Sequence, residues 1–132
     1  MQKLRPILLL ASALLCCACK ELNPPHPKPY EVVWVKVDSW SGHGSTQTDS
    51  FDMQVASWRV KWKTFNGSGP FVLTVNSAIS GRPLSEIVNR TGPGEGIAYV
   101  NDDPRLYHMV VDSRDTDWTI TVEQPVIKGG PR

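Results

Sequence analysis

Strict alternation of apolar and polar residues most constrains the fold of this 132-residue chain. In residues 58–63, Trp, Val and Trp occupy every second position, and Arg, Lys and Lys lie between them. The same period of two recurs in residues 33–37, 71–76, 107–111 and 118–122. Successive side chains of a β-strand point to opposite faces, so this pattern indicates strands that bury one face.

Short turn sequences separate these segments, namely SGHGS, NGSGP, SGRP, GPGEG, NDDP and SRDTD. Gly, Pro, Asn and Asp favour tight turns, and their spacing predicts about seven or eight short strands. We expect them near residues 31–40, 48–55, 57–65, 70–78, 84–89, 96–100, 105–112 and 117–124. Residues 83–90 could instead hold a helical turn or two. The pattern predicts one all-β domain, an antiparallel β-sandwich in preference to a small barrel, with jelly-roll or immunoglobulin-like strand order undecided.

The amino-terminal 18 residues have the layout of a secretory signal. Lys3 and Arg5 precede 13 residues, 6–18, in which Ser12 is the one clearly polar residue, and the small Ala18 ends the run. A membrane-spanning helix needs about 20 apolar residues, and Lys20 ends this run too early. We therefore expect a cleaved leader and export.

All three cysteines, Cys16, Cys17 and Cys19, lie at the end of this run. An exported protein usually pairs its cysteines in disulfides, but the sequence after residue 19 carries no thiol. The three histidines are scattered, which argues against a zinc site. These cysteines therefore require another explanation.

The small residue and cysteine at Ala18–Cys19, after a short apolar run, resemble the signal of bacterial lipoproteins. The resemblance implies that the Cys19 sulfur carries a diacylglyceryl group and that the cleaved amino terminus is acylated. The family usually has Leu three residues before the acceptor, where this chain has Cys16. Cys17, with Leu14 and Leu15 upstream, is therefore the second candidate acceptor. Lys20, in place of the family's retention aspartate, implies outer-membrane delivery in a cell with two membranes. An ordinary secreted protein remains the alternative.

The chain after the leader divides into three predicted parts. Residues 19–29 would form the lipidated cysteine and a proline-rich tether, since four prolines favour an extended polyproline conformation. Residues 30–124 would form the β-sandwich, and residues 125–132 a flexible tail. The anchor would hold the protein at the cell membrane or outer membrane, facing the periplasm or the exterior.

Three motifs within the predicted domain are WSG at 40–42, WRVKW at 58–62 and DWTITVEQ at 117–124. This loose pattern of tryptophans and glycines resembles the small β-domains of uncharacterised bacterial lipoproteins, over about residues 31–124. The resemblance implies no particular activity.

Charge and motifs argue against several classes of function. Loss of Lys3 and Arg5 with the leader leaves 12 of the 14 basic residues against 13 acidic ones, so we expect no nucleic-acid partner. Signature motifs of serine hydrolases, P-loop enzymes and zinc proteases are absent from the sequence. We predict no catalytic residue and no cofactor; a small hydrolase that uses His43 or His108 is the least favoured alternative.

The five tryptophans are the best sequence clue to a ligand. Trp58, Trp62 and Trp118 fall on apolar faces and are predicted to be core. Trp34 and Trp40 fall opposite the valines of residues 33–37, so they are the better candidates for exposed, ligand-binding rings, together with His43 in its Gly-rich loop. Packing of the two rings under a loop or an edge is the stronger interpretation.

Asp112, Asp115 and Asp117 form a weak calcium candidate, because calcium prefers several oxygen ligands. A turn role is the stronger interpretation of these aspartates. Taken together, we predict a non-enzymatic, membrane-anchored binding or interaction module, whose partners would be the membrane and an envelope protein or glycan. The alternative is a carbohydrate-binding module that uses Trp34 and Trp40.

Overall fold

The computed structural model describes residues 29–129, of which Glu31–Lys128 form one compact unit. The predicted leader, Cys19 and residues 20–28 of the tether lie outside the described residues, as do residues 130–132. Among residues 29–129, we find no helix long and apolar enough to cross a membrane.

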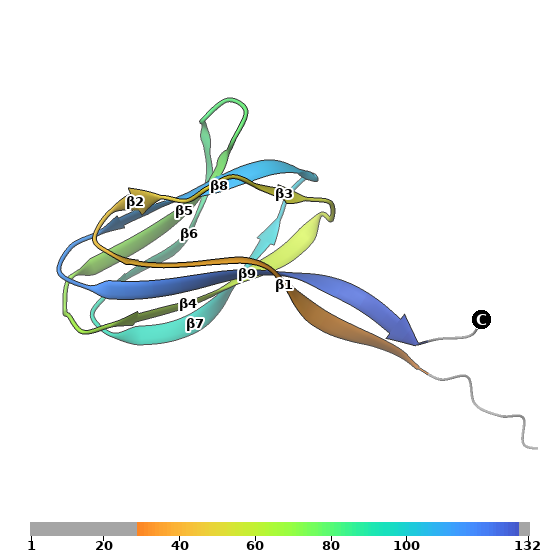
Figure 1. The fold of residues 1–132 in the computed structure, drawn as a ribbon, viewed down its shortest axis with the longest axis horizontal. Coiled ribbons are helices and arrows are strands. Elements are labelled where there is room, and N and C mark those ends of the chain that lie inside the picture. The colour runs from red at the N-terminus through yellow and green to blue at the C-terminus, as the bar shows by residue number, and fades with distance from the viewer. Residues whose placement is uncertain (1–28, 130–132) are drawn as a thin grey trace, which may run out of the picture. The chain divides into compact units, whose positions relative to one another are not determined.

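The compact unit is built from nine β-strands (Figure 1), which confirms the all-β prediction. They are β1 (Tyr30–His43), β2 (Thr46–Gln47), β3 (Phe51–Met53), β4 (Ser57–Phe65), β5 (Pro70–Ser77), β6 (Pro83–Thr91), β7 (Gly94–Asn101), β8 (Arg105–Ser113) and β9 (Asp117–Gly129). Of the strand expected near 48–55, only β3 forms, and the two-residue β2 precedes that range. The alternative of a helical turn at 83–90 is wrong, since this segment is strand β6, and β9 continues past residue 124 to Gly129.

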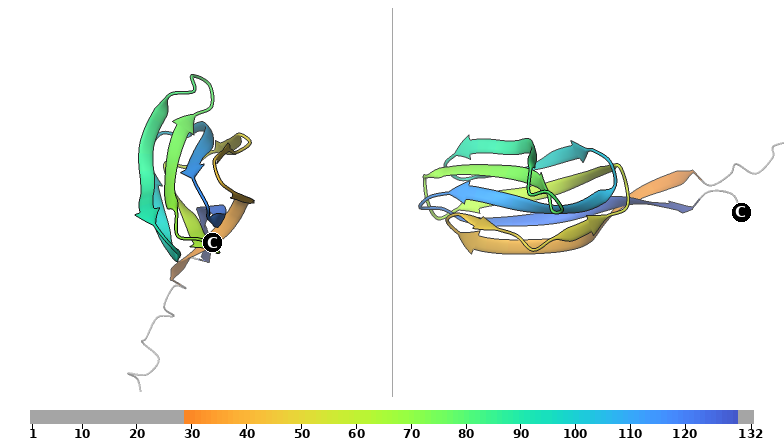
Figure 2. Two further views of the ribbon diagram at one scale, coloured as in Figure 1. Left: turned by 90° about the vertical axis from the view of Figure 1, so that its left-hand side faces the viewer. Right: turned by 90° about the horizontal axis from the view of Figure 1, so that it is seen from above.

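The strands form two antiparallel sheets that pack face to face as a β-sandwich (Figures 1 and 2). Sheet A has the order β1-β9-β4-β7. Sheet B has the order β2-β8-β5-β6, and β3 also pairs with β8. The predicted sandwich is therefore confirmed.

The strands pair from the two ends of the chain inward, so that the first pairs with the last and the middle two pair with each other. The pairs are β1 with β9, β2 and β3 with β8, β4 with β7, and β5 with β6, and successive pairs alternate between sheets A and B. This is the strand order of a jelly roll, so the choice that the sequence left open is resolved.

The inward face of each strand supplies the core. Its largest fully buried side chains are Trp58, Trp118, Tyr107, Phe71, Met53, Leu73, Met109 and Ile120. Each contributes roughly 1.5–3 kcal/mol by leaving water, which explains why strict alternation determines the fold. The core prediction for Trp58 and Trp118 is confirmed. Trp62 is half-buried and stacks on Phe71, with ring centroids 6.2 Å apart.

Candidate binding face on sheet A

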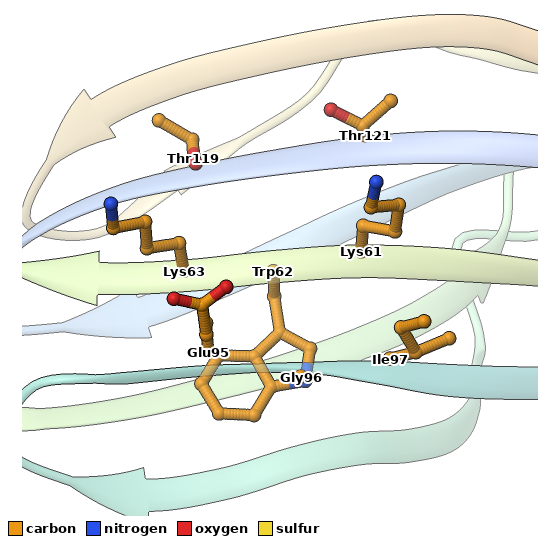
Figure 3. Close-up of a pocket in the computed structure, with 8 residues that line it drawn as sticks. All are labelled: Lys61, Trp62, Lys63, Glu95, Gly96, Ile97, Thr119 and Thr121. Atoms are coloured by element: carbon orange, nitrogen blue, oxygen red, sulfur yellow. The ribbon is translucent and has the colours of Figure 1, made fainter.

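The outer face of sheet A carries a shallow groove of about 460 Å³ (Figure 3). It exists because β4 alternates strictly: Trp58, Val60 and Trp62 point to the core, so Lys61 and Lys63 point outward. The outward residues that line it are Lys61, Lys63, Glu95, Ile97, Thr119 and Thr121. The inward-facing pair Trp62 and Gly96, in the row between the lysines, also borders it.

Strand register arranges these side chains in rows across three strands. Lys63 lies between Thr119 of β9 and Glu95 of β7. In the next row Lys61 lies between Thr121 and Ile97. Figure 3 shows both lysine side chains directed toward the β9 side, where the two threonines lie. Residues two apart on a strand are about 6.6 Å apart, so the groove presents repeated ammonium and hydroxyl groups at that interval.

An aromatic and charged cluster continues the same face in the third row. Arg59 lies between Glu123 and Tyr99, and its Nε donates a hydrogen bond of 2.7 Å to Glu123 Oε1. The guanidinium carbon of Arg59 lies 4.1 Å from the ring centroid of Trp34. The rings of Trp34 and Tyr99 meet edge to face, with centroids 6.1 Å apart. These four side chains therefore hold one another in place.

The charged side chains of the aromatic cluster form an ion pair, whereas the lysines of the groove do not. The side chains of Arg59 and Glu123 are only 16% and 13% exposed, and they neutralise each other. By contrast, Lys61 and Lys63 are exposed, and among residues 29–129 neither forms an ion pair within 4 Å. The ring of Tyr99 is 60% exposed. The face thus offers free cationic donors next to an accessible aromatic ring.

His43 has an orienting partner that sequence reasoning did not find. Its Nδ1 lies 2.7 Å from Asp117 Oδ1, and Asn66 Nδ2 donates to Asp117 Oδ2 at 3.0 Å. The hydrogen bonds from Asn66 and then from His43 lower the pKa of the Asp117 carboxyl below its usual value. Within residues 29–129 the His43 ring is bonded to Asp117 alone, and a catalytic triad requires a nucleophile beside the imidazole as well. His108, the other histidine considered for a hydrolase, is buried on β8 opposite Asn76.

The prediction that Trp40 is an exposed ring on the same face as Trp34 is wrong. Trp40 is half-buried and packs against the core, with its ring centroid 5.6 Å from that of Phe51. Val37 also packs against the core, although the two residues are three positions apart. The alternation of β1 is therefore broken between them, and a count by twos from Trp34 places Trp40 on the wrong side.

The three aspartates of the calcium candidate are held apart by the two-layer architecture. Asp112 is exposed on β8 of sheet B, whereas Asp117 begins β9 of sheet A. Asp115 lies in the turn between them, with a left-handed φ of 52°. Across residues 29–129, no group of three His, Cys, Asp or Glu side chains is arranged to hold a metal ion. Asp115 agrees with the role of aspartate in turns, whereas Asp112 and Asp117 lie on strands.

Sequence reasoning also missed Tyr99, the most exposed aromatic ring of this face. The signal was present in the alternation Ile97-Ala98-Tyr99-Val100, in which Val100 is buried and Tyr99 therefore points outward. In comparisons with known proteins, no family model and no curated protein matches this chain.

Proposed function

We propose that this protein is a non-enzymatic binding module, anchored at the cell envelope by a lipid on Cys19, that presents the outer face of sheet A to a ligand. The observation that carries the binding part is the three-row face itself. Arg59 and Glu123 fix the aromatic cluster, while Lys61 and Lys63 remain free to bind a ligand. Donors that are already in place lose little conformational freedom when a ligand binds.

The anchoring part is supported by the Ala18–Cys19 sequence and the proline-rich residues that follow. Ten residues of polyproline chain at about 3.1 Å each would space the domain roughly 30 Å from the membrane. One acyl chain binds a bilayer only marginally, whereas two or more hold a protein there stably. Lipidation would therefore keep the binding face at the envelope.

A glycan is the ligand class that the aromatic cluster favours. Aromatic rings stack on the apolar faces of sugar rings, and neighbouring Arg, Glu, Lys and Thr side chains hydrogen-bond to hydroxyl groups. Trp34 and Tyr99 would serve as the platform, in place of the Trp34 and Trp40 pair expected from the sequence.

Retention of the purified protein on insoluble peptidoglycan tests both the aromatic platform and the outer face of sheet A as a whole. We expect Tyr99→Ala to weaken binding at least about tenfold, the equivalent of 1.4 kcal/mol. Ile79→Ala is the control, because Ile79 is also an exposed apolar side chain, at 82% against 60% for Tyr99, but lies on the β5–β6 connection of sheet B. Equal retention of Tyr99→Ala and wild type would exclude the aromatic platform. If a Lys61→Ala, Lys63→Ala double variant also bound like wild type, the whole face would be excluded as the peptidoglycan site.

A further inference from the structure

The connection between β4 and β5 begins with an Asn-Gly sequence that suits the geometry of this turn. Asn66 has a left-handed φ of 54°, a conformation that asparagine adopts more readily than most residues with a side chain. Gly67 passes so close to the β8–β9 connection that a Cβ atom on it would lie 1.7 Å from the carbonyl oxygen of Asp115. Figure 1 shows the two connections at one end of the sandwich, on the left. The fold therefore places glycine directly after an asparagine.

An asparagine in this position can lose its side-chain amide by reaction with its own main chain. The Gly67 nitrogen gives up its proton to solvent and attacks Cγ of Asn66, which forms a C–N bond. The side-chain nitrogen takes up a proton from water and leaves as ammonia. Water then opens the cyclic succinimide at either carbonyl, which gives aspartate or isoaspartate. Glycine favours the attack because it has no side chain to obstruct it and its backbone is the most permissive.

Both reacting groups are accessible in the folded chain. Asn66 is exposed and Gly67 is half-buried. The Gly67 N–H donates none of the backbone or side-chain hydrogen bonds found among residues 29–129. The Asn66 amide is held by one exposed hydrogen bond, from its Nδ2 to Asp117 Oδ2 at 3.0 Å. When this bond opens, the side chain is free to turn toward the Gly67 nitrogen.

Asn89 provides a matched comparison within the same molecule. It is also exposed, and its Nδ2 also donates to a carboxylate, Glu86 Oε2, at 3.3 Å. Unlike Asn66, it lies inside strand β6, where it pairs with Val72. The residue after it is Arg90, whose side chain obstructs attack by the following nitrogen. The two asparagines thus differ mainly in backbone conformation and in the residue that follows.

We propose that Asn66 is a site of spontaneous deamidation in the folded protein, with aspartate and isoaspartate as the products. The product changes the contact with Asp117, because a donor and acceptor are replaced by two carboxylates, and like charges at this distance repel. Isoaspartate also lengthens the main chain by one methylene, directly before the close contact of Gly67 with Asp115. Deamidated molecules should therefore be less stable than intact ones.

Peptide mapping of the folded, full-length protein after incubation in mildly alkaline buffer tests the reaction. We expect conversion of amide to acid at Asn66 at least about tenfold faster than at Asn89, a barrier difference of about 1.4 kcal/mol. Asn66→Gly, which keeps the left-handed conformation and removes the amide, should release correspondingly less ammonia. Equal rates at Asn66 and Asn89 would overturn the proposal. So would an Asn66 that reacts in urea-unfolded protein but stays intact in the folded protein.

The consequence at Asp117 has its own test, which requires neither a ligand nor the lipid anchor. Asn66→Asp reproduces one product, and we expect its urea midpoint at neutral pH to lie below that of wild type. Adding Asp117→Asn exchanges the donor and acceptor of the original hydrogen bond, so the double variant should recover much of the loss. An Asn66→Asp variant as stable as wild type, or a double variant no better than the single one, would contradict the repulsion between positions 66 and 117.

Discussion

Arg59 is the residue on which the outer face of sheet A depends most. It points away from the core, yet its side chain is only 16% exposed, because Trp34 covers its guanidinium and Glu123 accepts its hydrogen bond. A carboxylate as covered as that of Glu123 is costly to leave without its partner. Arg59 therefore stabilises the fold and positions the aromatic cluster.

Arg59→Met should lower the free energy of unfolding by about 2 kcal/mol, since partial solvent access reduces the cost of an unpaired Glu123 below that of a fully buried charge. Adding Glu123→Gln should recover much of the loss. Lys61→Met, one row along and exposed, should change stability by less than about 0.5 kcal/mol. Urea denaturation measures all three, and equal losses in Arg59→Met and Lys61→Met would contradict the role of the ion pair.

Asp117 should make stability depend on pH in one direction. Its folded pKa lies below the usual 3.8, because Asn66 and His43 hydrogen-bond to the charged carboxylate. A lowered carboxyl pKa adds stability above the unfolded pKa, and this stability is lost as pH falls through the folded pKa. Wild type should therefore exceed Asp117→Asn in urea midpoint at pH 7, and the difference should shrink below pH 4. A difference that stays constant down to pH 2 would contradict this.

At the scale of elements, two connections meet at one end of the sandwich and require glycine. A Cβ atom on Gly67 would lie 1.7 Å from the carbonyl oxygen of Asp115, and one on Gly69 would lie 1.8 Å from that of Arg114. The β4–β5 and β8–β9 connections thus touch backbone to backbone. No side-chain rotation relieves such a clash.

Gly69→Ala should therefore destabilise the protein by about 3 kcal/mol, at the upper end of overpacking effects, because main chain must move. Ser68→Ala, at the exposed position between the two glycines, is the control and should cost less than about 0.5 kcal/mol. Thermal denaturation of both variants compares them directly. Similar midpoints would show that the connections separate easily.

The elements themselves were largely predictable from the sequence, because period-two alternation reports burial on one face. The failures occurred where that period is interrupted. Trp40 follows the break in β1, so counting by twos placed it outside the core. In residues 83–90 the exposed face of an edge strand is polar along most of its length, which left a helical turn open.

At the scale of the whole molecule, the sequence could not predict which strands pair. Alternation identifies the face of a strand that is buried but contains no information about its neighbours, so the nested order of β1 with β9 and β4 with β7 required the structure. The candidate site shows the same limit. Trp34 lies on the outer face opposite Val33 and Val35 but is half-buried rather than exposed, because Arg59 and Tyr99, from strands far away in sequence, pack against it.

The proposed role of the protein at the cell envelope requires that the sandwich be held at a membrane by its amino terminus. Intact-mass analysis of the protein extracted from native membranes tests this most directly. We predict a chain that begins at Cys19 and carries the added mass of a diacylglyceryl group and an amide-linked acyl chain. An unmodified amino terminus, on protein recovered from the aqueous fraction, would contradict it.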